Sequence, residues 1–271
     1  MLVTIISVKL LLAVDFCGSK KSTSFELTNF IAVKIKSYAS IVLKKASTYQ
    51  IATAVAIFFH VIGLAGILLS EGDFFIQSTP FNLLLSFGLL VWTHSDKNKP
   101  FLLFIGVVFL IGYFSEVVGV NTGLLFGEYQ YSKVLGFQWL QVPLLIAINW
   151  FIIIYCCGIS THTFLQKLIQ RVALDTQQPP TLLKALSVIV DGACLAVFFD
   201  WLMEPVAVKL GFWIWKGDGA IPLYNYICWL LISILLLTFF NFLSFRKENK
   251  FAVNLLLIQA LFFLILRTFL K

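Results

Sequence analysis

Residues 182–204 read LLKALSVIVDGACLAVFFDWLME, an almost unbroken apolar run. A helix needs about 20 such residues to cross the hydrocarbon core of a bilayer. The run also carries Asp191, Asp200 and Glu204. Ionisable groups are costly inside a membrane and mark candidate functional sites there. The stretch therefore predicts a membrane-spanning helix with chemistry on one or more of its faces.

Six further apolar runs follow the same rule along the chain. With 182–204 they give seven predicted spans, of which the second is short: 49–70, 79–94, 100–120, 139–160, 182–204, 222–245 and 251–269. We therefore predict an all-α fold, a polytopic membrane helical bundle of about seven transmembrane helices, with six to eight as the range.

Composition supports a lipid environment. Of the 271 residues 60% are hydrophobic and 12% are charged, and the mean hydropathy is +0.94. A soluble domain of this size shows more polar surface to water. The net charge of +7 does not indicate a nucleic-acid partner, because no segment is long enough to form a basic soluble surface. The expected partner is the lipid bilayer.

The domain organisation and orientation follow from the lysines and arginines. Residues 1–48 hold a polar, lysine-bearing stretch and are interpreted as a cytoplasmic or interfacial leader, and 49–271 as a single transmembrane domain. Basic residues gather in the loops that share a side with this leader, which predicts a cytoplasmic N-terminus. Loops 119–138 and 204–222 then lie together on the outer side, where their polar and aromatic residues meet.

Acids are the first candidates for chemistry. Glu116 lies near the outer end of the third span, and Glu128 follows in the outer loop. Asp200 and Glu204 are four residues apart and share one helix face, whereas Asp191 is turned to the opposite face. A carboxyl group buried without a basic partner keeps its proton and can donate it. The alternative is structural, with the acids only tying helices together through hydrogen bonds.

The sequence lacks the residues that several other classes of enzyme need. The three histidines lie on different segments without paired spacing, which argues against a di-iron hydroxylase or desaturase. The five cysteines have no metal-ligand spacing. No aspartate pair suits a magnesium-diphosphate site, and no nucleotide loop or nucleophile elbow occurs. We expect no metal site.

Two blocks of residues resemble those of a known family. The first comprises EVVGVNTG at 116–123, FGEYQY at 126–131, Leu135-Gly136 and Val142-Pro143-Leu144. The second comprises Asp200, Pro205-Val206-Ala207, GFWIW at 211–215, PLYN at 222–225 and Trp229. Together they resemble the membrane carotenoid biosynthesis protein family, of the carotenoid 1,2-hydratase and bisanhydrobacterioruberin hydratase type.

The resemblance implies an enzyme, a cofactor-independent hydro-lyase that adds water to the terminal double bond of an acyclic carotenoid end group. Such a reaction needs a proton donor, a way to tolerate a tertiary carbocation and one delivered water. Implied partners are a membrane-embedded carotenoid and, as candidates, other enzymes of the pathway. The implied location is a bacterial cytoplasmic membrane.

We hypothesise roles on this basis. Glu116 or Asp200 donates the proton, and Glu204 or Glu128 assists the water. The expected substrate-binding residues, which fix the geometry or stabilise the cation, are Asn121, Tyr129, Tyr131, Trp213, Trp215 and Asn225. The two tryptophans equally suit an interfacial aromatic belt.

Two alternatives of other classes remain open. One is a non-enzymatic carotenoid- or lipid-binding membrane protein, in which the acids only brace helices. The other is a small proton-coupled transporter with Glu116 and Asp191 as a relay. A hydratase predicts acids clustered at one end in an aromatic-lined pocket, whereas a transporter predicts a polar path across the membrane.

Overall fold

Helices make up most of the backbone in the computed structural model, which describes residues 46–69, 72–172, 180–217 and 219–270. The helices are α3 (Thr48–Leu69), α4 (Asp73–Gln77), α5 (Thr79–Thr93), α6 (Lys99–Thr122), α7 (Leu145–Val172), α8 (Thr181–Lys209), α9 (Leu223–Phe242) and α10 (Lys250–Phe269). The strands are β1 (Tyr129–Tyr131), β2 (Gln138–Trp139), β3 (Val142–Pro143) and β4 (Trp213–Trp215).

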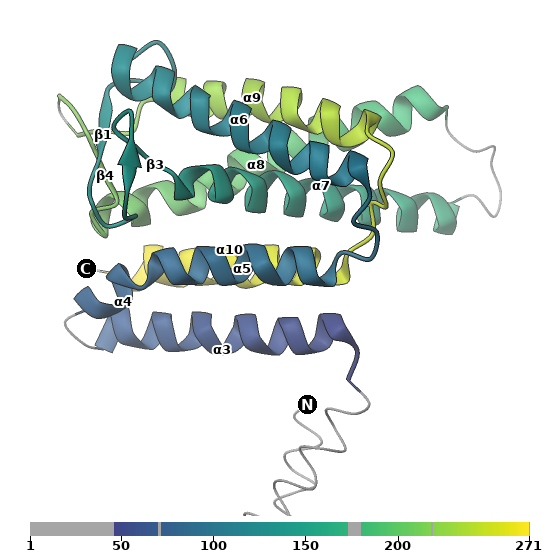
Figure 1. The fold of residues 1–271 in the computed structure, drawn as a ribbon, viewed down its shortest axis with the longest axis horizontal. Helices are drawn as coiled ribbons and strands as arrows, with labels where there is room; N and C mark the ends of the chain where they lie inside the picture. Colours follow the sequence, from purple (N-terminus) through teal and green to yellow (C-terminus); the bar gives the residue numbers. More distant parts are fainter. Residues whose placement is uncertain (1–45, 70–71, 173–179, 218, 271) are drawn as a thin grey trace, which may run out of the picture. The chain divides into compact units, whose positions relative to one another are not determined.

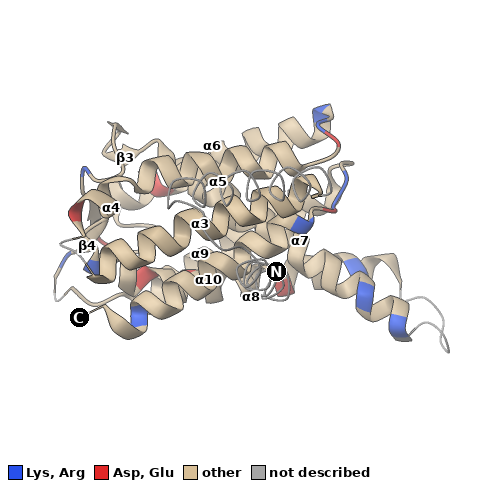
Figure 2. Cartoon of the chain, turned by 90° about the horizontal axis from the view of Figure 1, so that it is seen from below, with Lys and Arg blue, Asp and Glu red and all other residues tan. Residues whose placement is uncertain are grey.

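The membrane-spanning character of the helices is confirmed. All the helices named above except α4 and α5 are long and apolar enough to cross a bilayer, and α5 is a shorter apolar helix. Lysines and arginines lie at helix ends and in loops, so that the helix bodies carry few charges (Figure 2). The protein is therefore an all-α polytopic bundle, as predicted. The predicted leader lies outside the described residues apart from 46–48 and stays a prediction.

The helices pack in layers (Figure 1). Helices α6 and α9 lie on one side of α7 and α8, while α5 and α10 lie on the other side, followed by α3. The four helices α6 to α9 contact one another in a ring, because α6 meets both α7 and α9 and α8 meets the same two. This ring is the frame of the candidate site.

The fourth span begins later than predicted. Residues 138–143 form a small hairpin of β2 and β3 in place of the first turns of a helix. Leu140 and Gln141 make its turn in the left-handed region, with φ of 49° and 67°. Because the hairpin carries apolar residues, composition alone did not separate it from α7. Helix α7 then continues to Val172, beyond the predicted end at residue 160.

Helix α8 continues through Pro205, although the predicted span ends at residue 204. A proline has no N–H, so the carbonyl four residues earlier loses its helical partner. That carbonyl belongs to Trp201, and it accepts a hydrogen bond of 2.6 Å from the Arg267 guanidinium of α10. The guanidinium also lies over the Trp201 ring, 3.8 Å from its centroid. Helix α10 thus satisfies the backbone group that the proline leaves open.

A buried polar cluster joins α5, α7 and α10. His94 Nδ1 lies 2.7 Å from the Tyr155 hydroxyl, which also accepts a hydrogen bond from Asn249. The Asn249 side chain caps α10 by accepting from the amides of Phe251 and Ala252. Through the Tyr155 hydroxyl and the Asn249 amide the cluster ties three helices together, although His94 Nε2 has no partner among the described residues.

Close helix packing depends on small residues around Leu237 of α9. A Cβ atom on Gly158 of α7 would lie 3.0 Å from the Leu237 side chain, and one on Gly192 of α8 would lie 2.9 Å from it. Leu237 itself is fully buried. Helix association in a membrane relies on such close packing, since lipid tails are as apolar as leucine.

We predict that Gly192→Leu destabilises the bundle by about 1–3 kcal/mol, because the added atoms overpack the contact with Leu237. Thermal unfolding of the detergent-purified protein measures this change. The matched control is Gly106→Leu on α6, where nothing lies within 4 Å of an added Cβ atom. We expect the control to melt at or above the wild-type temperature, and equal melting of both variants would contradict the packing argument.

Candidate active site

Strands β1 and β4 pair as an antiparallel ribbon at one end of the ring of helices. Tyr129 lies opposite Trp215 in this ribbon. Tyr131 lies opposite Trp213. Since alternate residues of a strand share a face, the two tyrosines and two tryptophans point the same way, and the middle residue of each strand is exposed. The ribbon therefore presents four aromatic side chains with polar tips to the bundle.

The tyrosines of the ribbon bind Glu116 of α6. The hydroxyls of Tyr129 and Tyr131 donate to Glu116 Oε2 at 2.5 Å and 2.8 Å. Trp150 of α7 donates from Nε1 to Glu116 Oε1 at 2.9 Å. Gly119, one turn after Glu116, leaves room for this arrangement, because a Cβ atom there would lie 2.8 Å from the Tyr129 oxygen. Both oxygens of this buried acid thus have donors.

The tryptophans of the ribbon bind a second acid, Glu204 of α8. Trp213 and Trp215 both donate from Nε1 to Glu204 Oε1, each at 2.7 Å. Glu204 is 3% exposed, and the tryptophans are 9% and 5% exposed. Burial at this level does not suit an interfacial aromatic belt, whose rings face the lipid headgroups. The tryptophans instead hold an acid in place.

The third acid, Asp200, lies one turn before Glu204 on the same face of α8. Its Oδ2 accepts a hydrogen bond of 2.9 Å from the amide of Asn225 on α9. Its Oδ1 is buried and has no hydrogen-bond partner among the described residues. An unpaired buried oxygen is costly unless something else occupies the space beside it. Asp200 thus has a fully buried oxygen that the described residues leave unpaired.

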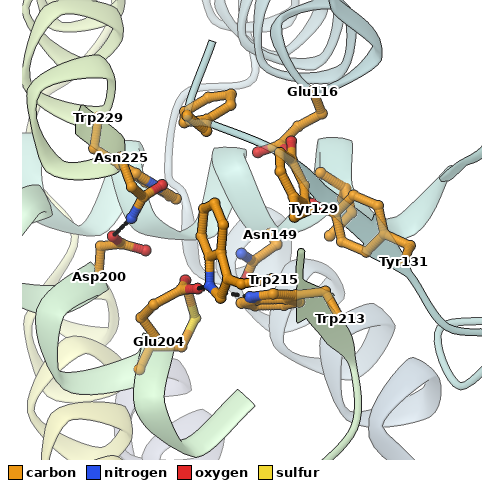
Figure 3. Close-up of a pocket in the computed structure, with 13 residues that line it drawn as sticks. Glu116, Tyr129, Tyr131, Asn149, Asp200, Glu204, Trp213, Trp215, Asn225 and Trp229 are labelled. Carbon is orange, nitrogen blue, oxygen red and sulfur yellow. Dashed lines mark hydrogen bonds between the residues drawn. The ribbon is translucent and has the colours of Figure 1, made fainter. Parts of the chain in front are cut away.

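The three acids line one small pocket with a cavity volume of about 20 Å³, which is room for a water molecule (Figure 3). Its wall comprises Glu116, Phe126, Tyr129, Tyr131, Ile146, Asn149, Asp200, Met203, Glu204, Trp213, Trp215, Asn225 and Trp229. Trp229 stacks on Trp150 with ring centroids 3.9 Å apart. The pocket thus combines carboxyl groups with aromatic faces.

One wall residue adopts an unusual backbone conformation. Phe126 has a φ of 64°, in the left-handed region that side chains other than glycine rarely adopt. Its amide is held by the sulfur of Cys228 on α9 at 3.3 Å. Backbone strain of this kind persists where surrounding contacts impose it, and it is common at functional sites. Here it turns a buried phenyl ring into the pocket.

The two tyrosines of the ribbon remain neutral donors. Burial, together with the nearby Glu116 carboxyl, raises the pKa of Tyr129 far above its usual value. The same causes raise the pKa of Tyr131. A neutral phenol keeps its O–H and can go on donating to an acid.

Most of the residues singled out in the sequence come together here. The pocket contains Glu116, Asp200 and Glu204, together with Tyr129, Tyr131, Trp213, Trp215 and Asn225. Glu128 and Asn121 lie outside it, and both are exposed. Glu128 extends the ribbon through its backbone carbonyl, which accepts from the Lys216 amide. Asn121 donates to the carbonyl of Leu140 and so ties the end of α6 to the hairpin.

Asp191, the second member of the alternative proton relay, is exposed on α8 and does not line the pocket. The opposite helix face predicted for it relative to Asp200 accounts for this placement. No described polar path connects it to Glu116, so the transporter alternative gains no support from the arrangement.

Sequence reasoning did not name five of the wall residues as site residues. Asn149 had a usable signal, since it is a lone amide within an apolar run, and Phe126 and Trp229 belong to the two blocks that carry the family resemblance. Ile146 and Met203 had none, because apolar side chains in an apolar helix do not reveal which face lines a pocket.

Comparison with known proteins agrees with these residues. Residues 79–271 match the family described as carotenoid biosynthesis protein. Over 136 residues the chain is 29% identical to the bisanhydrobacterioruberin hydratase of Haloarcula japonica, covering 49% of this chain and 42% of that protein. The chain thus aligns with less than half the length of this curated relative. No solved structure matches. The match over residues 79–271 includes every residue of the pocket and establishes that the chain belongs to the carotenoid biosynthesis protein family.

Proposed function

We propose that the protein is a carotenoid hydratase, which adds water to the terminal double bond of an acyclic carotenoid end group. The observation that carries the proposal is the gathering of three buried carboxyl groups and several aromatic rings in one pocket at one end of the bundle. Membership of a carotenoid biosynthesis family and the hydratase activity named for the relative from Haloarcula japonica support it.

The reaction proceeds in two balanced steps. An acid transfers its proton to the carbon of the double bond that bears one hydrogen, and the π electrons form the new C–H bond. The other carbon becomes a tertiary carbocation. The oxygen of a water molecule then forms a C–O bond to this carbon, and a carboxylate accepts the proton that the water releases. The sum is one water added and no change in oxidation state, so acids and bases of the chain suffice.

Asp200 is the best candidate for the proton donor. Its Oδ1 has no partner among the described residues, whereas its Oδ2 is fixed by Asn225. Burial without a cationic partner favours a neutral, proton-bearing carboxylic acid. Both oxygens of Glu116, by contrast, already accept hydrogen bonds from the chain. The unpaired oxygen of Asp200 therefore makes it a better proton donor to a substrate than Glu116.

Glu204 is suited to accept the proton released by water. It lies one helical turn from Asp200, and two indole N–H groups hold its Oε1. Hydrogen bonds from fixed donors favour a carboxylate over its neutral form. A proton accepted there can return to Asp200 after the product leaves, because the two side chains share one helix face.

Glu116 and the aromatic rings complete the proposed site. Glu116 anchors the two tyrosines of the ribbon, and through them it sets the position of the rings. Aromatic faces stabilise a cation through their quadrupole, and the rings of Tyr129, Trp213 and Trp215 surround the space where the cation would form.

The proposed setting follows from the substrate. A carotenoid is about as long as the hydrocarbon core is thick, about 30 Å. Lying across the bilayer, it would bring its end group to the end of the bundle that holds the pocket. We propose a bacterial cytoplasmic membrane with the N-terminus on the cytoplasmic side, and we propose other carotenoid enzymes as partners that supply and consume the pigment.

The first test is production of the protein in a host that accumulates lycopene. We expect chromatography and mass spectrometry to find a pigment heavier by one water. Asp200→Asn should lower this product by about 100-fold or more, because a general acid contributes at least about that factor. The asparagine has nearly the same shape but no proton to donate.

The matched control is Asp191→Asn, which makes the same change on the same helix but at an exposed position outside the pocket. It should leave hydration at the wild-type level when both proteins reach the membrane in equal amounts. Unchanged pigments with the wild-type protein, despite good membrane expression, would rule out this reaction on lycopene.

A second test concerns the N–H groups that hold Glu204. Trp213→Phe and Trp215→Phe keep an aromatic ring but remove one hydrogen bond each. We expect each change to lower the hydration rate about tenfold, the cost of losing a hydrogen bond to a charged group, and the double change to lower it further. Rates measured on purified protein in detergent check this, and full activity of the double variant would show that the rings act only through their shape.

A further inference from the structure

Asn149 of α7 is a polar wall residue that no other described residue binds through its side chain. Its side chain lines the pocket, directed into the same space as Asp200 and Glu204 (Figure 3), and makes no hydrogen bond to any described residue. The other amide of the pocket, Asn225, is bound to Asp200. Trp150, the next residue along α7, is bound to Glu116.

The Asn149 side chain is half-buried in apolar surroundings. Its neighbours on α7 are buried, with Ile146 at 3%, Trp150 at 0% and Phe151 at 0% exposure. A polar group in such surroundings has fewer hydrogen bonds to water and gains from a partner that replaces them. A small polar molecule that enters the pocket would be such a partner.

Water fits this space. A buried water usually makes two to four hydrogen bonds, about three on average. The Asn149 amide offers two donors and a carbonyl acceptor. Asp200 Oδ1, a buried atom of the pocket wall without a partner among the described residues, adds a further partner. These groups together can hold one water beside the acid that protonates the substrate.

We propose that Asn149 binds the water that adds to the carbocation. This assignment rests on the proposed hydratase function and adds a residue to it. The Asn149 carbonyl accepts one O–H of the water, which turns the oxygen lone pair toward the cationic carbon. The oxygen forms the C–O bond, and the other O–H proton passes to the Glu204 carboxylate. Asp200 supplies the proton of the new C–H bond, so protonation and water capture belong to different residues.

This division of roles predicts a distinct product when water capture alone fails. A cation that finds no water loses a proton from one of its methyl groups to a carboxylate. The result is an isomer of the substrate with a shifted double bond and no added oxygen. In D2O the isomer carries one deuterium at the carbon that was protonated, since one deuteron enters and one proton leaves.

The experiment compares purified wild type, Asn149→Leu and Asp200→Asn with lycopene in detergent made up in D2O. Leucine has nearly the size of asparagine but cannot bind water. We expect Asn149→Leu to lower the hydrated product by about tenfold or more, the effect of losing a hydrogen bond at a reacting charge, while the deuterated isomer accumulates. Asp200→Asn should lose both the hydrate and the deuterium label.

Two results would overturn the assignment. One is normal hydration by Asn149→Leu. The other is loss of both the hydrate and the deuterated isomer in a variant whose thermal unfolding matches the wild type. Should the wild type itself give no hydrate, the proposed function fails and the assignment fails with it, a result distinct from either of these.

A second pair of variants keeps the test valid if the leucine variant does not fold. Asn149→Ser and Asn149→Ala differ by one hydroxyl, which can bind water through a donor and an acceptor. We expect the serine variant to hydrate several times faster than the alanine variant, with a lower share of deuterated isomer. Equal hydration and equal isomer shares in the two variants would count against Asn149.

Discussion

The pairing of β1 with β4 is the constraint on which the rest of the site depends. Each acid that the ribbon holds comes from a different helix, Glu116 from α6 and Glu204 from α8. A buried carboxyl group needs donors, and a helix cannot supply them from its own backbone, because its N–H groups are already used. The ribbon supplies four side-chain donors from one face. The buried acids and the ribbon therefore stabilise each other. Neither would be stable in lipid without the other.

Elsewhere in the bundle, side chains of neighbouring helices also bind buried polar groups. Pro205 leaves the Trp201 carbonyl of α8 without a helical partner, and Arg267 of α10 donates a hydrogen bond to it. The Tyr155 hydroxyl lies against His94 and accepts from Asn249, and so joins three helices. Other buried atoms, such as His94 Nε2 and Ser233 Oγ, have no partner among the described residues. The unpaired Oδ1 of Asp200 is therefore distinguished by its place in the wall of a pocket that holds two other acids, and not by the missing partner alone.

The sequence predicted much of this protein because lipid imposes simple rules. Apolar runs gave the spans, and the four-residue spacing of Asp200 and Glu204 placed both acids on one face. The ribbon could not be derived in the same way, because β1 and β4 are separated by two helices and their pairing leaves no periodic signal. Glu128 illustrates the limit: it stands next to Tyr129, but in a strand neighbouring side chains point to opposite faces, so it turned away from the pocket.

The position of the pocket reconciles two opposed demands of the proposed chemistry. A carbocation survives only where water is scarce, whereas hydration needs one water at the right moment. A site deep in the bundle would satisfy the first demand and fail the second, and an open loop would do the reverse. A ring of helices closed at one end by an aromatic ribbon satisfies both. The ribbon excludes bulk water with indole and phenol rings, while their N–H and O–H groups are directed at carboxyls that can pass a single proton. Selectivity for one water then depends on the few polar groups of the pocket that are left to bind it, among them Asp200 Oδ1 and the side chain of Asn149.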